Sequence, residues 1–512
     1  MSSNTKDLAA NAIIGPLVGE EPANKSTTAQ AEEIDPYLVT FQTPFDADDP
    51  ITWPSSRKWA VTNVLSATGF NRIMVSTIMA PALPALAREL HMSTTESVMS
   101  LSIYVLATAL GPLLIGPLSE MYGRQVVLHA SNAWFLLWNI VCGFANTKEL
   151  LIASRFLAGF GASAIYSLAG GVLGDVWPAE QRGRSLGLYI LIPILGSAVG
   201  PIIGGFMAER TTWRWMFWAT SIFQALMIAV SLVVFKETYA PLILRRRAVR
   251  LRRETGDARY HTASERRDRD ETSLLSLWGR TLTRPLRLLV FHPIIQVTAA
   301  IEAFYYGILY IVLSSFASVW TDQYGQSTEA SGLHYVACAL GEVAGGLVGG
   351  PMMDFMYRHM LARAAKSRGG GSQEAARHVP EFRIPLILPV AFLGPIGLFA
   401  YGWAAAYRAH WLAVDAGVFV YMFGGQIAGM PLQAYVMDAY PEHTGSALAA
   451  AQFLRSMAAF LFPLFAPSLY AALGYGWGNS TIAFIALVFG IPAPLLLWFW
   501  GARLRAKATS SH

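Results

Sequence analysis

The chain has 512 residues, of which 54% are hydrophobic and 14% are charged, its net charge is +5, and its mean hydropathy is +0.40. A soluble domain carries about 25% charged residues, so this composition excludes an ordinary soluble protein and indicates an integral membrane protein. The two cysteines, Cys142 and Cys338, lie in separate apolar stretches and offer neither a disulfide framework nor a metal-ligand spacing.

Residues 1–52 form a polar segment rich in Ser, Thr, Asn, Ala, Asp and Glu. The segment lacks the basic, apolar and small-residue order of a cleaved signal peptide. Its composition predicts a disordered cytosolic tail.

The apolar runs that follow are long enough to cross a bilayer, which takes about 20 residues of helix. They predict an all-α membrane protein with an N-terminal six-helix bundle (53–235), a basic linker (236–290), a C-terminal six-helix bundle (291–502) and a short tail (503–512). The twelve spans are expected near residues 59–86, 97–118, 126–146, 150–174, 185–208, 215–235, 291–320, 330–353, 384–407, 411–437, 444–472 and 478–502.

The distribution of Lys and Arg predicts the orientation of these spans. The tails and loops on the side of the termini hold 30 of these residues, and the loops on the other side hold five. This bias places both termini in the cytosol. The protein is expected in the plasma membrane or, alternatively, in the vacuolar membrane.

The linker has ten arginines between residues 245 and 269. Such a run is typical of a solvated loop that follows the positive-inside rule, or of a segment that binds anionic lipid at the inner leaflet. Both interpretations stay open, whereas a nucleic-acid partner is not expected for a loop tethered to a membrane.

A weak internal repeat supports two related bundles. Residues 116–124 and 350–358, which are 234 residues apart, each place Gly-Pro, a carboxylate and an arginine at one spacing where a helix leaves the membrane. Parallel six-helix repeats produce such a pattern.

From Trp53 onward the chain resembles the major facilitator superfamily, and later motifs are similar to its fungal drug:proton antiporter branch. The resemblance rests on a loop motif at 116–124, a fourth-helix motif at 151–164, a fifth-helix exporter motif at 196–205, and the segments 237–241, 306–310, 438–449 and 454–456. It implies two pseudo-symmetric bundles around a central cavity lined by helices 1, 4, 7 and 10.

Charged residues inside a membrane are costly and mark candidate functional sites. The resemblance implies that Arg155, in the fourth span, takes part in proton coupling; the alternative is a permanent ion pair. Glu302, followed by Tyr305 and Tyr306, and Glu342 are candidate proton carriers, because burial favours the neutral carboxyl. Either could instead be a hydrogen-bonded structural group.

Arg72 is the least expected charge, near the middle of the first span. The 234-residue offset places it opposite Tyr306 and about one turn from Glu302. We hypothesise that Arg72 and Glu302 pair across the cavity in one state. Capture of an organic anion by Arg72 and a static ion pair are the alternatives. Asp415 is interpreted as a solvated helix end, and Arg455 as structural.

A charged cluster is expected at the cytosolic mouth of the first bundle. Charge-assisted hydrogen bonds there could latch one transport state, although ordinary surface pairs would contribute only about 0–1 kcal/mol. The residues concerned are Gly116, Glu120, Gly123, Arg124, Asp175, Arg182 and Arg184.

The exporter motif comprises Gly196, Gly200, Pro201, Gly204 and Gly205. Its glycines predict close helix packing, and Pro201 predicts a bend. The predicted direction of transport, export, depends on this motif. The alternative is that the motif serves only for close packing of helices.

These features predict a secondary active transporter that exports small amphipathic molecules, drugs or secreted metabolites, in exchange for protons. Uptake of a nutrient or organic anion, and a transporter-like receptor, are the alternatives.

No catalytic triad, zinc spacing or phosphate-binding glycine loop points to an enzyme. The expected partners are a small-molecule substrate, protons and the bilayer. The expected state is a monomer without a cofactor, driven by the proton gradient.

Overall fold

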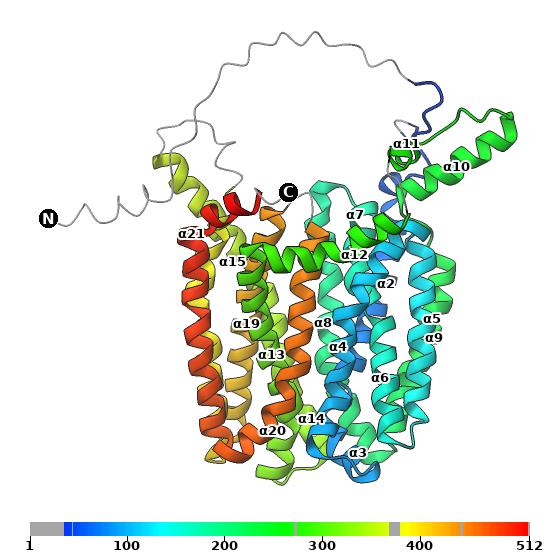
Figure 1. Cartoon of the computed structure of the whole chain (residues 1–512). Coiled ribbons are helices and arrows are strands. Elements are labelled where there is room, and N and C mark those ends of the chain that lie inside the picture. Colours follow the sequence, from blue (N-terminus) through cyan, green and yellow to red (C-terminus); the bar gives the residue numbers. More distant parts are fainter. Residues whose placement is uncertain (1–34, 43–44, 271–273, 368–378, 441–443, 510–512) are drawn as a thin grey trace.

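The computed structural model describes residues 35–42, 45–270, 274–367, 379–440 and 444–509, except for some side chains within these ranges. The described chain is almost entirely helical, and a single β-bridge joins Leu38 to His261. Figure 1 shows two groups of roughly parallel helices, with the first and last described segments of the chain on the same side. We call this the terminal side.

The N-terminal bundle follows the predicted order, with breaks in two of its spans. Its helices are α2 (Ser55–Thr77), η2 (Ala80–Ala82), α3 (Leu83–Glu89), α4 (Thr94–Tyr122), α5 (Arg124–Gly143), α6 (Lys148–Ala162), α7 (Ala164–Val176), α8 (Ala179–Arg210) and α9 (Arg214–Val234). The first predicted span is thus α2 followed by η2 and α3, and the fourth is divided at Ser163 into α6 and α7.

The C-terminal bundle contains more short helices. It consists of α13 (Pro293–Ser318), the π-helical turn η3 (Val319–Gln323), α14 (Thr328–Leu333), α15 (Tyr335–Ser367), η4 (Pro380–Leu386), α17 (Ile387–Val390), α18 (Leu393–Ala406), α19 (Trp411–Ala439), α20 (Thr444–Gly490) and α21 (Pro492–Thr509).

The described residues contain eleven apolar stretches long enough to cross a membrane. The last one, 445–505, has 61 residues and contains Gly474 at φ 69°, where the helical path is interrupted. A single straight helix of that length would be about 90 Å long, far longer than a bilayer. The chain turns back at Gly474, so it makes the twelve crossings that the sequence predicts.

The two bundles share one hydrophobic core on the side opposite the termini. There Ile78 and Met79 of the first bundle lie in the same buried cluster as Phe316, Trp320 and Tyr335 of the second.

On the terminal side each bundle has its own core. One contains Val61, Leu168 and Trp177, and the other contains Ile294 and Tyr435. The bundles are therefore joined away from the termini and packed independently near them.

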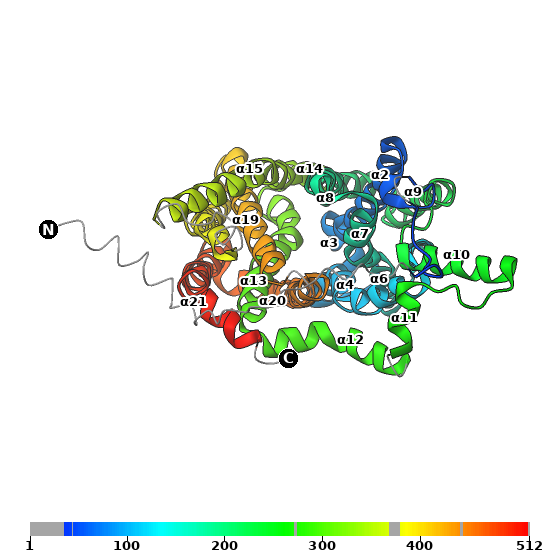
Figure 2. The same ribbon diagram turned by 90° about the horizontal axis from the view of Figure 1, so that it is seen from above.

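The linker is helical rather than extended. It forms α10 (Ala240–Thr255), α11 (Ala263–Asp270) and α12 (Leu274–Phe291). Seen from above, α12 runs along one side of the molecule past α20 and α4, and so connects the second bundle to the first (Figure 2).

The last part of the predicted disordered tail differs from that expectation, because it packs against the linker. The two terminal nitrogens of the Arg247 guanidinium in α10, Nη1 and Nη2, donate to the carboxylate of Asp46 at 2.6 and 2.8 Å. Nη2 also donates to Asp48. The Leu38–His261 bridge ties the same segment to the linker. The acidic residues of the tail thus neutralise part of the positive charge of the linker.

Candidate functional site

A buried charge pair lies within the C-terminal bundle, where α13 packs along α20. Oε2 of Glu302 is 4.0 Å from Nη1 of Arg455, and the two side chains are 6% and 19% exposed. The guanidinium of Arg455 also lies 4.6 Å from the ring centroid of Tyr306. The pair compensates the charge of Glu302, and the aromatic face adds a cation–π contact.

Hydrogen bonds continue from this pair to the other bundle. Arg455 donates to the side-chain oxygen of Gln452, whose amide nitrogen donates to Ser456 at 2.8 Å. The hydroxyl of Ser456 is 3.1 Å from that of Thr108 in α4. We call these residues, together with Glu302, the polar seam. It links a buried carboxylate to the interface between the bundles.

A second polar contact joins the bundles between α8 and α15. The hydroxyl of Ser197 lies 2.6 Å from Oε2 of Glu342. Ser197 belongs to the exporter motif, so the two sequence features singled out separately meet at one point.

Arg72 does not pair with Glu302 in this structure. Its guanidinium donates to the carbonyl oxygen of Ala162 at 3.2 Å and to the side chain of Asn132, and Arg72 is only 2% exposed. These partners all belong to the N-terminal bundle. The pairing hypothesis is therefore not met in this conformation, because nearby neutral oxygens compensate the charge locally.

Arg155 is fully buried and bonds carbonyl oxygens rather than a carboxylate. It donates to Val75 at 2.9 Å, Ser100 at 3.2 Å and Leu101 at 3.4 Å, and it lies 4.5 Å from the ring of Tyr104. The expected carboxylate is absent from its described partners. One guanidinium thus ties the ends of α2 and α4 to α6.

Two further candidates have different surroundings from those expected. The hydroxyl of Tyr305 lies beside the last residue of α20, since a Cβ added at Gly490 would be 2.6 Å from it. Asp415 is not a solvated end, because it is 9% exposed and Oδ2 lies 2.8 Å from Nδ1 of His334.

The predicted cytosolic latch is only partly assembled. Nη1 of Arg124 donates to Ser119 at 2.5 Å, and Nε donates to Asp175 at 3.4 Å. A carboxylate outside the predicted set, Glu237, accepts the backbone N–H of Arg124 at 2.9 Å. These residues all belong to the first bundle or to the start of the linker.

The other latch candidates contribute less to this cluster. Gly123 has φ 94°, and a Cβ there would lie 2.2 Å from Oε2 of Glu237, so only glycine fits. Glu120 is exposed, and a Cβ added at Gly116 would only reach ordinary contact with the Cβ of Ser167, at 4.0 Å. The side chains of Arg182 and Arg184 lie outside the described residues.

The exporter-motif glycines form a ridge on α8. A Cβ added at Gly196, Gly200 or Gly204 would lie 2.6, 2.6 or 1.9 Å from a backbone carbonyl oxygen, namely that of Phe70 or Met74 in α2 or of Ile78, which directly follows α2. The absence of side chains on the ridge lets the two helix backbones approach closely.

The end of the ridge faces the other bundle. A Cβ at Gly205 would lie 2.8 Å from the carbonyl oxygen of Thr328 and 3.2 Å from the Cα atom of Gly332 in α14. The carbonyl oxygen of Pro201 is close to Gly332 in turn. The motif therefore packs α8 on α2 and also closes the junction between the bundles opposite the termini.

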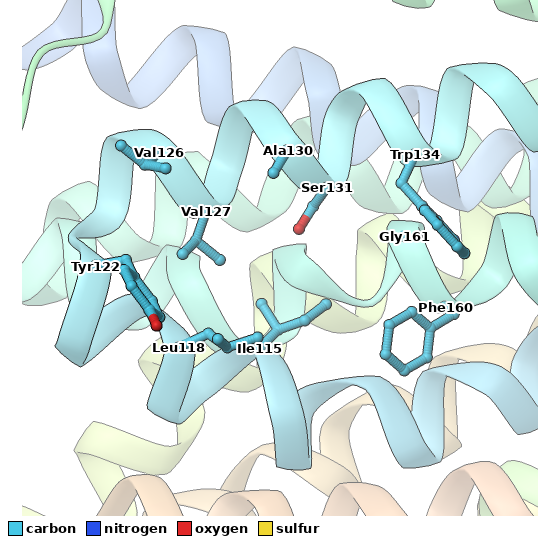
Figure 3. A pocket seen from close by; sticks show the side chains of 10 residues that line it. All are labelled: Ile115, Leu118, Tyr122, Val126, Val127, Ala130, Ser131, Trp134, Phe160 and Gly161. Carbon is cyan, nitrogen blue, oxygen red and sulfur yellow. The ribbon is translucent and has the colours of Figure 1, made fainter. Parts of the chain in front are cut away.

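Two of the grooves formed by the described residues lie at the surface of the bundles. The one in Figure 3, of about 310 Å³, is lined by side chains of α4, α5 and α6, with the hydroxyl of Ser131 facing it. Tyr122, Val126 and Trp134 on its rim are 56%, 51% and 41% exposed. The other, of about 630 Å³, contains His334 and Asp415. Both are separate from the polar seam.

Sequence reasoning missed Gln452, Ser456, Thr108, Ser197 and Glu237. Gln452, Arg455 and Ser456 recur at the three- and four-residue spacing of one helix face, which was a usable signal. Thr108 and Ser197 gave none, because small hydroxyl residues are common in membrane helices.

Comparison with known proteins extends this picture. The family model of the Major Facilitator Superfamily matches residues 65–463. The probable efflux pump mfs2 of Aspergillus flavus is 54% identical over 85% of this chain and 100% of its own length. The efflux pump vrtL of Penicillium aethiopicum is 40% identical over 93% of this chain and 91% of its own length.

A solved structure with the same fold is the crystal structure of a D-xylose-proton symporter. It is 17% identical, covers 86% of this chain and 97% of its own chain, and has a TM-score of 0.62. With two joined helix bundles, the family match and these relatives, the chain belongs to the Major Facilitator Superfamily and is a membrane transporter rather than an enzyme.

Proposed function

We propose that the protein exports small amphipathic molecules in exchange for protons by alternating access. The observation that carries this proposal is the glycine ridge of α8, which packs on the backbone of α2 and meets α14 across the bundle junction. Two similar proteins named efflux pumps support the same direction of transport.

The Lys and Arg bias supports cytosolic termini. With that orientation, the shared core closes the outer side and the separate cores belong to the cytosolic side. The structure would then represent an inward-facing state, ready to receive a molecule from the cytosol or the inner leaflet.

The polar seam, together with the adjacent Tyr306, is the proposed site for substrate and proton. Tyr306 and Arg455 are partly exposed, and Tyr166 of the first bundle lies close enough to interact with both electrostatically. Aromatic faces favour flat apolar groups, and the guanidinium favours an oxygen acceptor. The site thus fits an amphipathic molecule with at least one polar oxygen.

The remaining expectations complete the proposal. The proton gradient is the only energy source, no cofactor is needed, and a monomer suffices because one chain supplies both bundles. The plasma membrane is the proposed location. Anionic lipid at 245–269 would contact exposed arginines such as Arg246, Arg250 and Arg253, because Arg247, Arg252 and Arg259 pair with acids.

Expression in a pump-deficient yeast tests the proposal. Cells loaded with the fluorescent cation rhodamine 6G, or exposed to a panel of toxic amphipathic compounds, should accumulate less of at least one compound than control cells. A protonophore should abolish the difference. Higher accumulation in expressing cells would support uptake instead, and efflux that survives the protonophore would exclude proton coupling.

A further inference from the structure

The groove of about 630 Å³ lies where the first turns of α15 and α19 meet, on the side opposite the termini. The two helices are neighbours in the view from above (Figure 2). Further along them, a Cβ added at Gly341 or Gly345 would lie 2.7 or 2.8 Å from a backbone carbonyl oxygen of α19. The groove therefore ends where the two backbones come together, and its volume lies within the roughly 300–1,000 Å³ of small-molecule sites.

The groove faces the bilayer rather than the space between the bundles. Tyr335 of α15 and Val414 and Val418 of α19 belong to the core that both bundles share. Leu340 and Leu412, which line the groove, lie on the other faces of the same helices and are exposed. Both helices are apolar enough to span a membrane, so these exposed side chains meet lipid.

One end of the groove is polar and contains an oxygen without a partner. The ring of His334 stacks on Trp320 with centroids 3.5 Å apart, and its Nε2 is 3.0 Å from Oε1 of Gln326. Its Nδ1 is 2.8 Å from Oδ2 of Asp415. The other carboxylate oxygen, Oδ1, is buried and has no hydrogen-bond partner among the described residues. A buried acceptor without a donor is costly, so a bound molecule that supplies the hydrogen is stabilised there.

The polar and apolar ends lie at different depths. Asp415 is four residues beyond Trp411, the first residue of α19, which corresponds to about 6 Å along the helix. Phe419 and Leu340, which line the other end, lie about one further turn into their helices. Tryptophan is common at membrane boundaries. The groove thus suits a molecule with its polar head near the boundary and its apolar body in the leaflet.

The apolar part of the groove favours a flat body. Three lining residues, Ala330, Ala337 and Ala416, contribute only a methyl group each, whereas Trp411 and Phe419 contribute aromatic rings. Short side chains leave a smooth surface, on which a rigid and flat molecule makes many van der Waals contacts. A rigid body also loses little conformational entropy when it binds.

The polar end favours a neutral hydroxyl as the head. The described residues that line the groove include no Lys or Arg, so a phosphate or carboxylate head would face Asp415 without a cation. Oδ2 of Asp415 already has His334 as its partner. A single hydroxyl, which has one hydrogen to donate, is sufficient for Oδ1.

We propose that this groove binds one membrane sterol, a flat and rigid apolar molecule with a hydroxyl at one end. The hydroxyl donates to Oδ1 of Asp415, and the ring system lies on the alanines between α15 and α19. Because Oδ1 is covered by neighbouring atoms, a side chain at the rim rotates as the sterol enters. The inference concerns a lipid of the membrane rather than the transported molecule, and it does not depend on the direction of transport.

Photocrosslinking tests the inference on the whole chain. The protein is placed in phosphatidylcholine nanodiscs that contain a photoreactive cholesterol with a diazirine in its ring system, and the labelled residues are mapped by mass spectrometry. We expect labels within residues 330–340 and 411–419. Excess cholesterol should reduce this labelling at least several-fold, whereas its 3-O-methyl ether, which has no hydrogen to donate, should compete much less.

Two substitutions on α19 separate the groove from the rest of the lipid-facing surface. Ala416→Leu fills the alanine floor and should reduce the labelling at least several-fold. Ala413→Leu makes the same change at an exposed position of the same helix that does not line the groove, and should leave the labelling unchanged. If Ala416→Leu lowers the thermal unfolding midpoint, Val336→Phe narrows the groove from α15 instead.

Equal labelling of the groove-filling and control variants, or labels confined to other segments, would overturn the inference. Equal competition by cholesterol and its ether would reject the hydrogen bond to Asp415. Competition by the lipid amine sphingosine but not by cholesterol would identify a cationic molecule as the occupant and exclude a sterol. Rhodamine 6G efflux is measured separately, so its absence would count against export and not against sterol binding.

Discussion

Glu302 and Arg455 place their charged groups 4.0 Å apart inside one bundle, so this charge pair travels with the bundle as a unit. At this depth, the bundles meet through apolar side chains and through side-chain hydrogen bonds such as Thr108–Ser456 and Ser197–Glu342. A neutral hydrogen bond contributes only about 0.5–1.5 kcal/mol. The bundles can therefore separate and rejoin without breaking a buried ion pair.

Neutralising one member of the pair should disable transport. Glu302→Gln leaves the guanidinium of Arg455 buried without its counter-charge, which is costly in a membrane. We expect protonophore-sensitive efflux of rhodamine 6G from yeast to fall by more than about tenfold, equivalent to 1.4 kcal/mol. Efflux is measured at matched amounts of protein in the membrane.

A charge exchange tests whether the partner of Glu302 is Arg455 or Arg72. The double variant Glu302→Arg with Arg455→Glu should recover part of the efflux lost in each single variant. The double variant Glu302→Arg with Arg72→Glu should recover none, because Arg72 bonds Ala162 and Asn132 instead. The opposite pattern would support the hypothesis that Arg72 pairs with Glu302.

The glycine ridge provides a test of close packing. In Gly204→Ala, the new Cβ would lie 1.9 Å from the carbonyl oxygen of Ile78, so α8 and α2 must move apart. Overpacking of this kind costs about 1–3 kcal/mol, and we expect a lower thermal unfolding midpoint together with loss of efflux. Gly187→Ala on the same helix meets no atom within 4 Å and is the matched control. Equal effects of both substitutions would exclude a role for the ridge.

The helices and their division into two bundles could be predicted because each span must satisfy its backbone hydrogen bonds within a long apolar run. The closeness of α8 to another helix was also predictable from Gly196, Gly200 and Gly204. The identity of that neighbour, α2, and the contact of Gly205 with α14 were not. They depend on how the helices are placed around each other.

The partner of Glu302 could not be found by pseudo-symmetry. The internal repeat places Arg72 near Glu302. The long side chain of Arg72 instead donates hydrogen bonds to oxygens of Asn132 and Ala162 in its own bundle. Arg455 is far from Glu302 in the sequence and becomes its neighbour only because α20 packs along α13. Charge compensation in membranes is thus decided by tertiary packing.

Arg155 should behave as a structural clamp of the first bundle. In Arg155→Lys the positive charge stays, but a single ammonium cannot reach the three carbonyl oxygens of Val75, Ser100 and Leu101 in the geometry of a guanidinium. We expect a lower unfolding midpoint in detergent, while the residual efflux per folded molecule keeps its dependence on the proton gradient. Loss of that dependence in a normally stable Arg155→Lys protein would instead assign Arg155 to proton coupling.

The segment before α2 that packs against the linker should be destabilised in acid, because Asp46 becomes protonated. The guanidinium of Arg247 holds the pKa of Asp46 well below its usual range, by direct hydrogen bonding. The stabilisation is present above the ordinary aspartate pKa of about 3.9 and is lost as the pH falls below it toward the lowered value. At neutral pH, Asp46→Asn should mimic this loss. Amide hydrogen exchange at Gln42 and Asp48, whose N–H groups bond Asp46, should become about tenfold faster, because a hydrogen bond to a charged group contributes about 1.5–3 kcal/mol. Asp48→Asn, which removes a single more exposed bond to Arg247, should have a smaller effect at Gln42. Unchanged exchange in Asp46→Asn would mean that other contacts hold the segment in place.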